Sequence, residues 1–192
     1  MPNHVTNVVT ASNEVLKALM DDKGNATFTK LVPEPENIET DGCSMDAVNG
    51  VHAGGVVCWY DWHLSNWGTK WDAYDSIYTG DKLQFDTAWS TPAEVWKALH
   101  AKFPDEHIEI EWADEDFGYN VGTITIDPSL EDGFLINKLD NSDAGNELAA
   151  KIKYGKSYAE VLKEWGDEEE VDWANVEPAE EEVVSEETIE QG

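Results

Sequence analysis

Alternation of apolar and polar residues predicts strands in the second half of the chain. Two segments repeat this pattern with a period of two: Lys82–Trp89 and His107–Trp112. A further pair of strands is predicted at Val121–Asp127 and Phe134–Ile136. A period of two is typical of strands that bury one face and leave the other polar.

Helical periodicity separates these strands, with apolar residues recurring every three to four positions. The first such helix follows Ser12 and ends near Gly24. The second begins at a capping box, with Thr91 at the N-cap, Pro92 at the first helical position and Glu94 closing the box. The sequence therefore predicts a helix after each of two strands.

The order of elements predicts an α+β fold of the ferredoxin-like type. Two strands, Val5–Ala11 and Ala26–Val32, enclose the first helix, and two later strands enclose the second. This strand–helix–strand repeat is the split βαβ order, with two helices on one face of an antiparallel sheet. Extra C-terminal strands and helices follow, including a helix near Asp143–Lys153 and one capped by Ser157 with Glu160. The second sheet face is open unless these extra elements cover it.

The chain divides into one domain and a tail. Residues 1–166 suffice for a single domain with its own core. Within it, residues 34–80 are rich in Gly, Asn and Asp and are predicted to form a Trp-rich insertion. Residues 167–192 carry twelve carboxylates and no Lys or Arg, which predicts an acidic, disordered tail.

Charge is the strongest indication of partners. The chain holds 41 Asp and Glu against 12 Lys and Arg, a net charge of −29. Removing the twelve tail carboxylates leaves −17 on residues 1–166. Such a field repels nucleic acid and anionic lipid and attracts basic protein surfaces, so we expect no direct nucleic-acid binding and a basic protein partner.

Carboxylates on the polar positions of two predicted strands, together with the start of the tail, form the candidate partner-binding surface. Its members are Asp86, Glu109, Glu111, Asp114, Glu115, Asp116, Asp167, Glu168, Glu169 and Glu170. An ordinary solvated sheet face is the alternative interpretation of the strand positions.

Aromatic residues concentrate in the insertion and at the end of the next strand. A possible ligand pocket would be lined by Trp62, Asn66, Trp67, Lys70, Trp71 and Trp89. The alternative is a small core that packs the insertion against the sheet, since clustered Trp residues supply packing area.

No motif for catalysis, metal or cofactor emerges. The five His residues show no ligand spacing, and an Asp-rich loop at residues 140–151 has Lys151 where a calcium loop needs Glu. Cys43 and Cys58 have no C-x-x-C spacing and are expected to be reduced. Without a signal peptide or an apolar run long enough for a bilayer, the protein is expected in the host cytoplasm.

Several segments resemble the YubB ferredoxin-like domain family of phage and plasmid proteins. They are Met1–Asn7, Asn66–Trp71 with Asp72–Tyr74, Phe85–Pro92 and Trp112–Glu115. They spread over about residues 1–125 and leave residues 140–192 uncovered. The resemblance implies a ferredoxin-like core and a mobile-element origin, and it implies no activity or catalytic set.

Two functions of different class therefore remain open. The first is a non-enzymatic interaction protein that occupies a basic, nucleic-acid-binding surface of a host protein as a DNA mimic, with anti-defence activity as its use. The second is a small-ligand binder or enzyme that uses the Trp-rich insertion. An acidic accessory protein whose charge serves only solubility is a third, plainer possibility. The oligomeric state stays open.

Overall fold

A computed structural model describes residues 3–39 and 57–166 of the chain. Its elements in chain order are β1 (His4–Thr10), α1 (Asn13–Ala18), β2 (Ile38–Glu39), β3 (Val57–Cys58), α2 (Trp59–Asn66), β4 (Tyr74–Tyr78), β5 (Lys82–Ala88), α3 (Ala93–Lys102), β6 (Ile108–Asp114), β7 (Val121–Ile126), β8 (Phe134–Lys138), α4 (Asp143–Tyr154) and α5 (Tyr158–Trp165).

Six strands form one antiparallel sheet in the order β4-β5-β1-β6-β7-β8. The first four are two interleaved split βαβ units: β1–α1–β4 has β5 between its strands, and β5–α3–β6 has β1 between its strands. This is the ferredoxin-like arrangement that the sequence predicts. β7 and β8 extend the sheet on the β6 side.

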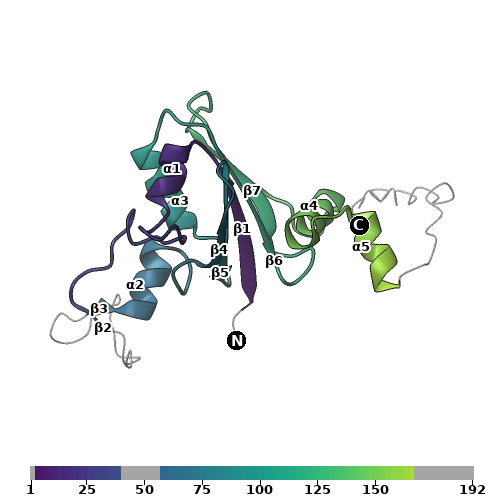
Figure 1. The fold of residues 1–192 in the computed structure, drawn as a ribbon, viewed down its shortest axis with the longest axis horizontal. Helices are drawn as coiled ribbons and strands as arrows, with labels where there is room; N and C mark the ends of the chain where they lie inside the picture. Colours follow the sequence, from purple (N-terminus) through teal and green to yellow (C-terminus); the bar gives the residue numbers. More distant parts are fainter. Residues whose placement is uncertain (1–2, 40–56, 167–192) are drawn as a thin grey trace, which may run out of the picture.

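Helices cover both faces of the sheet. In Figure 1, α1, α2 and α3 lie on one side of the strands, and α4 and α5 lie on the other. The main core lies on the α1–α3 side and includes Val5, Phe85, Trp96 and Ile110, all fully buried. A smaller core on the other side joins Ala113 and Val121 of the sheet to Leu148 and Ala149 of α4.

Alternation along the strands explains this two-sided packing. In β6, Ile108, Ile110 and Trp112 enter the main core, while Glu109 and Glu111 stand on the opposite face. The strands predicted at Lys82–Trp89, His107–Trp112, Val121–Asp127 and Phe134–Ile136 correspond to β5, β6, β7 and β8. All four strands were predicted correctly, and for β5 and β6 the prediction rested on a period of two.

The second strand of the ferredoxin-like core is not where the sequence predicts it. Residues 26–32 form only an isolated bridge from Ala26 to Met20 and a turn. The carboxylate of Asp72 accepts hydrogen bonds from the Phe28 N–H at 2.7 Å and the Thr27 hydroxyl at 2.7 Å, so this backbone is satisfied without a strand neighbour. The strand is instead β4, inside the predicted insertion.

Helix capping was predicted correctly at one of the two boxes. Ser157 and Glu160 form the full capping box of α5. At α3 the N-cap is Pro92, and no side chain caps the helix. The Thr91 hydroxyl is used otherwise, because it accepts a hydrogen bond from the Trp96 indole at 2.8 Å. A buried indole N–H needs an acceptor, and here it takes the one that the capping box would use.

Cys58 is buried, with 1% of its surface exposed, and is disulfide-bonded. The expectation of reduced thiols is therefore wrong for Cys58. Motif spacing gave no sign of this bond, because it does not report which sulfur atoms the fold brings within bonding distance. Cys43 and the predicted disordered tail lie outside the described residues.

Candidate functional site

The additional C-terminal helices cover much of the sheet face on which the candidate carboxylates were placed. α4 packs over β6 and β7, and Lys151 of α4 reaches Glu111 with Nζ to Oε1 and Oε2 distances of 2.8 and 3.0 Å. Glu111 is therefore engaged in an ion pair within the protein. The neighbouring Ala113 is fully buried beneath the same helix.

Two other candidates, Asp114 and Asp86, serve the interior of the protein. Asp114 is 4% exposed. It accepts hydrogen bonds from the side-chain amides of Asn120 at 2.7 Å and Asn3 at 3.2 Å. Asp86 is half-buried and accepts one from the Thr6 hydroxyl at 2.7 Å. Buried carboxylates need such hydrogen-bond donors. Asp114 and Asp86 therefore stabilise this end of the sheet and present little surface to another protein.

Lys153 of α4 supplies a cation beside these carboxylates. Its ammonium donates to the His4 carbonyl at 3.2 Å and the Thr6 hydroxyl at 3.0 Å. Burial lowers the pKa of Lys153, and the nearby charges of Asp86 and Asp114 oppose that shift. This lysine therefore neutralises part of the acidic face from within.

Tyr74 closes the cluster on the β4 side. Its hydroxyl lies 2.8 Å from the Nδ1 of His4. Burial, followed by the charge of Asp86, raises the pKa of Tyr74 to about 12, so the phenol stays neutral at physiological pH. The Tyr74 phenol and the half-buried Lys153 ammonium therefore bind and orient their neighbours at this end of the sheet.

The remaining body candidates are exposed. Glu115 and Asp116 lie at the end of β6, and Glu109 lies near its start. Glu109 has a neighbour in His107, whose ring bonds Asp127 at 2.6 Å and Glu109 at 3.3 Å. The hydrogen bond to Asp127 raises the pKa of His107. The tail candidates Asp167, Glu168, Glu169 and Glu170 lie outside the described residues.

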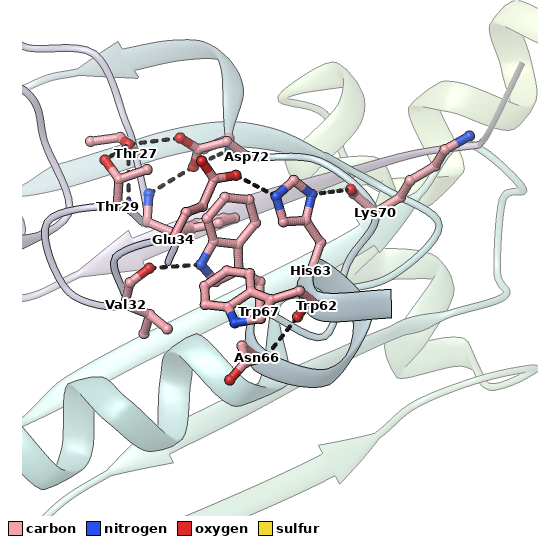
Figure 2. A network of polar contacts seen from close by, with 12 residues as sticks. Thr27, Thr29, Val32, Glu34, Trp62, His63, Asn66, Trp67, Lys70 and Asp72 are labelled. Atoms are coloured by element: carbon pink, nitrogen blue, oxygen red, sulfur yellow. Dashed lines mark hydrogen bonds and ion pairs between the residues drawn. The ribbon is translucent and has the colours of Figure 1, made fainter. Parts of the chain in front are cut away.

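Half of the possible pocket is packed interior. Trp67 is 1% exposed. Its indole donates to the Val32 carbonyl at 3.0 Å, and it stacks on His63 with ring centres 4.0 Å apart. Trp62 packs edge-on against Trp67, and the Asn66 amide donates to the Trp62 carbonyl at 2.9 Å. Figure 2 shows these contacts gathered around His63, and they match the small core considered as the alternative.

His63 links this core to the chain on both sides. Its Nε2 donates to Glu34 at 2.5 Å and its Nδ1 faces the Lys70 carbonyl at 2.8 Å (Figure 2). Residue 34 is thereby joined to the segment that follows α2. Trp62, Asn66 and Trp67 thus pack together and support the fold of the insertion.

The other half of the possible pocket lies at the surface. Trp71 is 37% exposed and Trp89 is 43% exposed. The Lys70 ammonium lies between them, 4.9 Å from the centre of the Trp71 ring and 4.7 Å from that of Trp89. We call Lys70, Trp71 and Trp89 the surface aromatic cluster. It is a cation–π arrangement in which one ammonium contacts two partly exposed tryptophans.

Trp89 holds an unusual backbone conformation, with φ at +70°. A residue with a side chain in this region carries about 1–3 kcal/mol of strain. Hydrogen bonds hold it there: its N–H donates to the Asn3 carbonyl at 2.9 Å, and its carbonyl accepts from the Asn120 amide at 2.9 Å. Trp89 thus combines a strained backbone with a partly exposed side chain, and packing in the core does not account for a tryptophan at this position.

The segments that carry the family resemblance meet around Trp89. Asn3 comes from the first segment, Lys70 from the second, Trp89 from the third and Asp114 from the fourth. Asn120 joins the last two, since it also donates to Asp114 at 2.7 Å. We call these residues, together with the neighbouring His4, Tyr74 and Lys153, the β1-start site.

Sequence reasoning missed several members of this site. His4 and Tyr74 stand in resembling segments, which was a usable signal. Lys153 lies outside the resembling region. Asn120 is one polar residue in a loop, and no motif around it indicates a role. Their roles come from how α4 and the β6–β7 loop fold back on the sheet.

No group of three or more His, Cys, Asp or Glu within residues 3–39 and 57–166 could hold a metal ion. Among these same residues, no helix has the length and apolar character needed to cross a membrane. The β1-start site presents aromatic rings, side-chain amides and carboxylates.

A family model described as the ferredoxin-like domain in Api92-like protein matches residues 66–177. The match takes in α4 and α5, so family similarity extends further toward the C-terminus than the resembling segments did. Searches of curated proteins and of solved structures found no match.

Proposed function

The chain belongs to the family of the ferredoxin-like domain in Api92-like protein, and on this premise we propose a non-enzymatic protein that binds a basic surface of another protein. The surface it occupies would ordinarily hold nucleic acid, so the protein acts as a DNA mimic. The resemblance to YubB-type proteins adds the proposed setting, which is a phage or plasmid product that counters a defence complex in the host cytoplasm.

One observation carries this proposal. Residues 103–137, which run from the end of α3 into β8, contain ten carboxylates and no lysine. Of the ten, only Asp114 is buried. The described residues as a whole hold 27 carboxylates against all 12 lysines, so the folded body is strongly negative without the tail.

One internal ion pair and several internal hydrogen bonds reduce the number of candidate carboxylates that a partner can reach. Glu111, Asp86 and Asp114 are engaged within the protein, as described above. The exposed carboxylates lie instead at the two ends of β6 and β7. Glu115 and Asp116 lie at the end that also contains the β1-start site, and Glu109 lies at the other end.

The surface aromatic cluster supports a protein partner over a solubility role. Trp71 and Trp89 are partly exposed and supply the aromatic contact area that is enriched where proteins bind one another. A charge that serves solubility alone requires no strained, exposed Trp89. The small-ligand alternative keeps only Lys70, Trp71 and Trp89 of its six lining residues, because the other three are packed.

Affinity capture tests the proposal. The full-length chain is immobilised, incubated with bacterial lysate at low salt and eluted with a salt series, with duplex DNA as competitor. Captured basic proteins should leave at about 0.2–0.5 M salt, because exposed charge pairs are screened within a few ångströms there. Duplex DNA should release the same proteins. Retention that ignores both salt and DNA would contradict mimicry.

Matched charge variants locate the surface. The triple variant Glu109→Gln, Glu115→Gln, Asp116→Asn should lose captured protein, and Glu14→Gln, Glu36→Gln, Glu39→Gln, with the same charge change at other exposed positions, should keep it. A third variant neutralises Asp167, Glu168, Glu169 and Glu170. If captured protein were lost in this variant alone, the tail would be the recognised segment and the proposal for the body surface would be wrong.

A further inference from the structure

Within residues 3–39 and 57–166 the sheet ends at β8, and the outer backbone groups of this strand point away from the other strands. β8 pairs with β7 on one side and is the last strand of the sheet. Two backbone hydrogen bonds lie at the two ends of this pairing: the Asp127 N–H donates to the Gly133 carbonyl, and the Leu139 N–H donates to the Val121 carbonyl. Antiparallel hydrogen bonds alternate, so Leu135 and Asn137 bond toward β7.

By the same alternation, the N–H and C=O groups of Phe134, Ile136 and Lys138 face the open edge. This edge is regular, since β7 and β8 pair without a register shift over five residues. Edge strands with a regular row of outward groups are templates for another strand. The backbone of β8 therefore satisfies the geometric requirement for strand addition.

The side chains of β8 favour an apolar strand partner. Leu135 is 45% exposed and Ile136 is 47% exposed, and they stand on opposite faces because successive strand residues alternate. β8 contains no carboxylate, so no acidic side chain of the strand itself would lie beside an added strand. An added strand would find an apolar neighbour on each face of the sheet.

The ends of β8 are acidic and define the charge of the occupant. Glu131 and Asp132 precede the strand and Asp140 follows it, all exposed. A second copy paired antiparallel about Ile136 would set Asp132 opposite the Asp140 of the other copy, and like charges directly opposite destabilise a pair. A strand with basic residues at its ends meets carboxylates at both ends instead.

We propose that the β8 edge binds an extended segment of a partner protein that has an apolar centre and basic flanks, by strand addition. The inference rests on the proposed function only for the sign of the partner's charge, because the backbone geometry stands without it. It adds a second contact to the exposed carboxylates and gives the partner's segment a defined conformation.

A synthetic peptide with the sequence KKVTVTVKK provides the probe. It is titrated into the full-length chain, with fluorescence anisotropy for affinity and backbone amide NMR for location. Binding should shift the amide signals of Phe134, Ile136 and Lys138 more than those of β4. A peptide with central proline, KKVTPTVKK, should bind at least about tenfold more weakly, because proline removes a strand hydrogen bond.

Two substitutions separate backbone from side chain. Ile136→Pro removes an outward N–H while the β7 bonds remain, and it should weaken binding about tenfold. Ile136→Thr keeps the N–H and should weaken binding less than Ile136→Pro. Ile77→Thr on the opposite edge strand is the matched control and should leave affinity unchanged.

Each remaining outcome overturns a part of the inference. Absence of peptide binding, or binding with signal changes away from β8, removes the strand-addition site and leaves the acidic-surface proposal to its own capture test. Equal binding of an acid-flanked peptide, EEVTVTVEE, removes the basic flanks from the inference. Dimerisation of the free chain that Ile136→Pro abolishes would assign the edge to a second copy.

Discussion

The two edges of the sheet differ in how they meet solvent. β4 has a register shift between Tyr74 and Ile77, and Asp75 at that shift has φ of +49°. The Tyr78 hydroxyl at the end of this edge bonds the Asn13 side chain and the Gly80 carbonyl. β8 pairs regularly with β7 and ends the sheet with its outward groups in a row.

The difference indicates that β4 is protected and β8 is not. A bulge, a charged residue and irregular backbone are the usual means by which an edge strand avoids pairing with another chain. β4 has all three, whereas β8 pairs regularly and has one charged residue, Lys138, within the strand and acidic residues beyond its ends. This difference between the two edges is consistent with a role for the β8 edge in binding another strand.

Proline substitution along β8 gives the largest expected effect. Leu135→Pro removes an N–H that bonds β7 and should lower the free energy of unfolding by about 3 kcal/mol. Ile136→Pro removes an outward N–H and should lower it by about 1 kcal/mol or less. Urea denaturation of both variants measures the difference, and equal losses would contradict the alternation assigned to this edge.

Relief of backbone strain at the protected edge should have a smaller, opposite effect. Asp75→Gly places at φ of +49° the residue that adopts this region freely. We expect the free energy of unfolding to rise by about 1 kcal/mol. Asp81→Gly, an exposed acid before β5, is the control for loss of charge. A loss of stability in Asp75→Gly would show that the bulge is not strained.

The hairpin that leads into β8 should show a pH dependence. Hydrogen bonds from Ser129 lower the pKa of Asp127 to about 2, and the bond to Asp127 raises the pKa of His107 above 6.5. Stability from Asp127 is present above its ordinary pKa of 3.8 and is lost as pH falls toward 2. Stability from His107 is full below pH 6.5 and is lost as pH rises through its raised pKa.

Imidazole NMR titration checks this pair. The pKa of His107 should fall in Asp127→Asn, because the carboxylate that bonds its Nδ1 is gone. His4 provides the internal reference in the same spectra. An unchanged titration of His107 in Asp127→Asn would contradict the contact.

The smallest expected effects come from exposed apolar residues on the two edges. Ile77 is 59% exposed and Ile136 is 47% exposed, so replacing either by Thr removes little buried surface. Each change should alter the free energy of unfolding by about 0.5 kcal/mol or less. A larger loss in Ile136→Thr would mean that this side chain is covered in the free protein.

Regular alternation allowed part of the sheet to be predicted from sequence, and its absence explains what was missed. β5 and β6 show a clean period of two. β4 does not, since Asp75 and Ser76 interrupt it at the bulge, and it was assigned to the insertion. Ala26–Val32 has strand composition, but the Asp72 carboxylate satisfies its backbone locally.

The candidate site was predictable in its residue types and not in their exposure. Sequence gives no indication of which sheet face α4 covers, so the engagement of Glu111 by Lys151 and the burial of Asp114 could not be foreseen. The same limit applies to the tryptophans. Trp67 and Trp71 lie four residues apart, yet one is buried and the other exposed.

Residue-resolved amide hydrogen exchange of the free full-length chain tests the open edge most directly. The account predicts fast exchange at Phe134, Ile136 and Lys138 and slow exchange at Leu135 and Asn137, which alternate with them. Slow exchange at all five would contradict it, because the outward row of β8 would then already be paired in the absence of a partner.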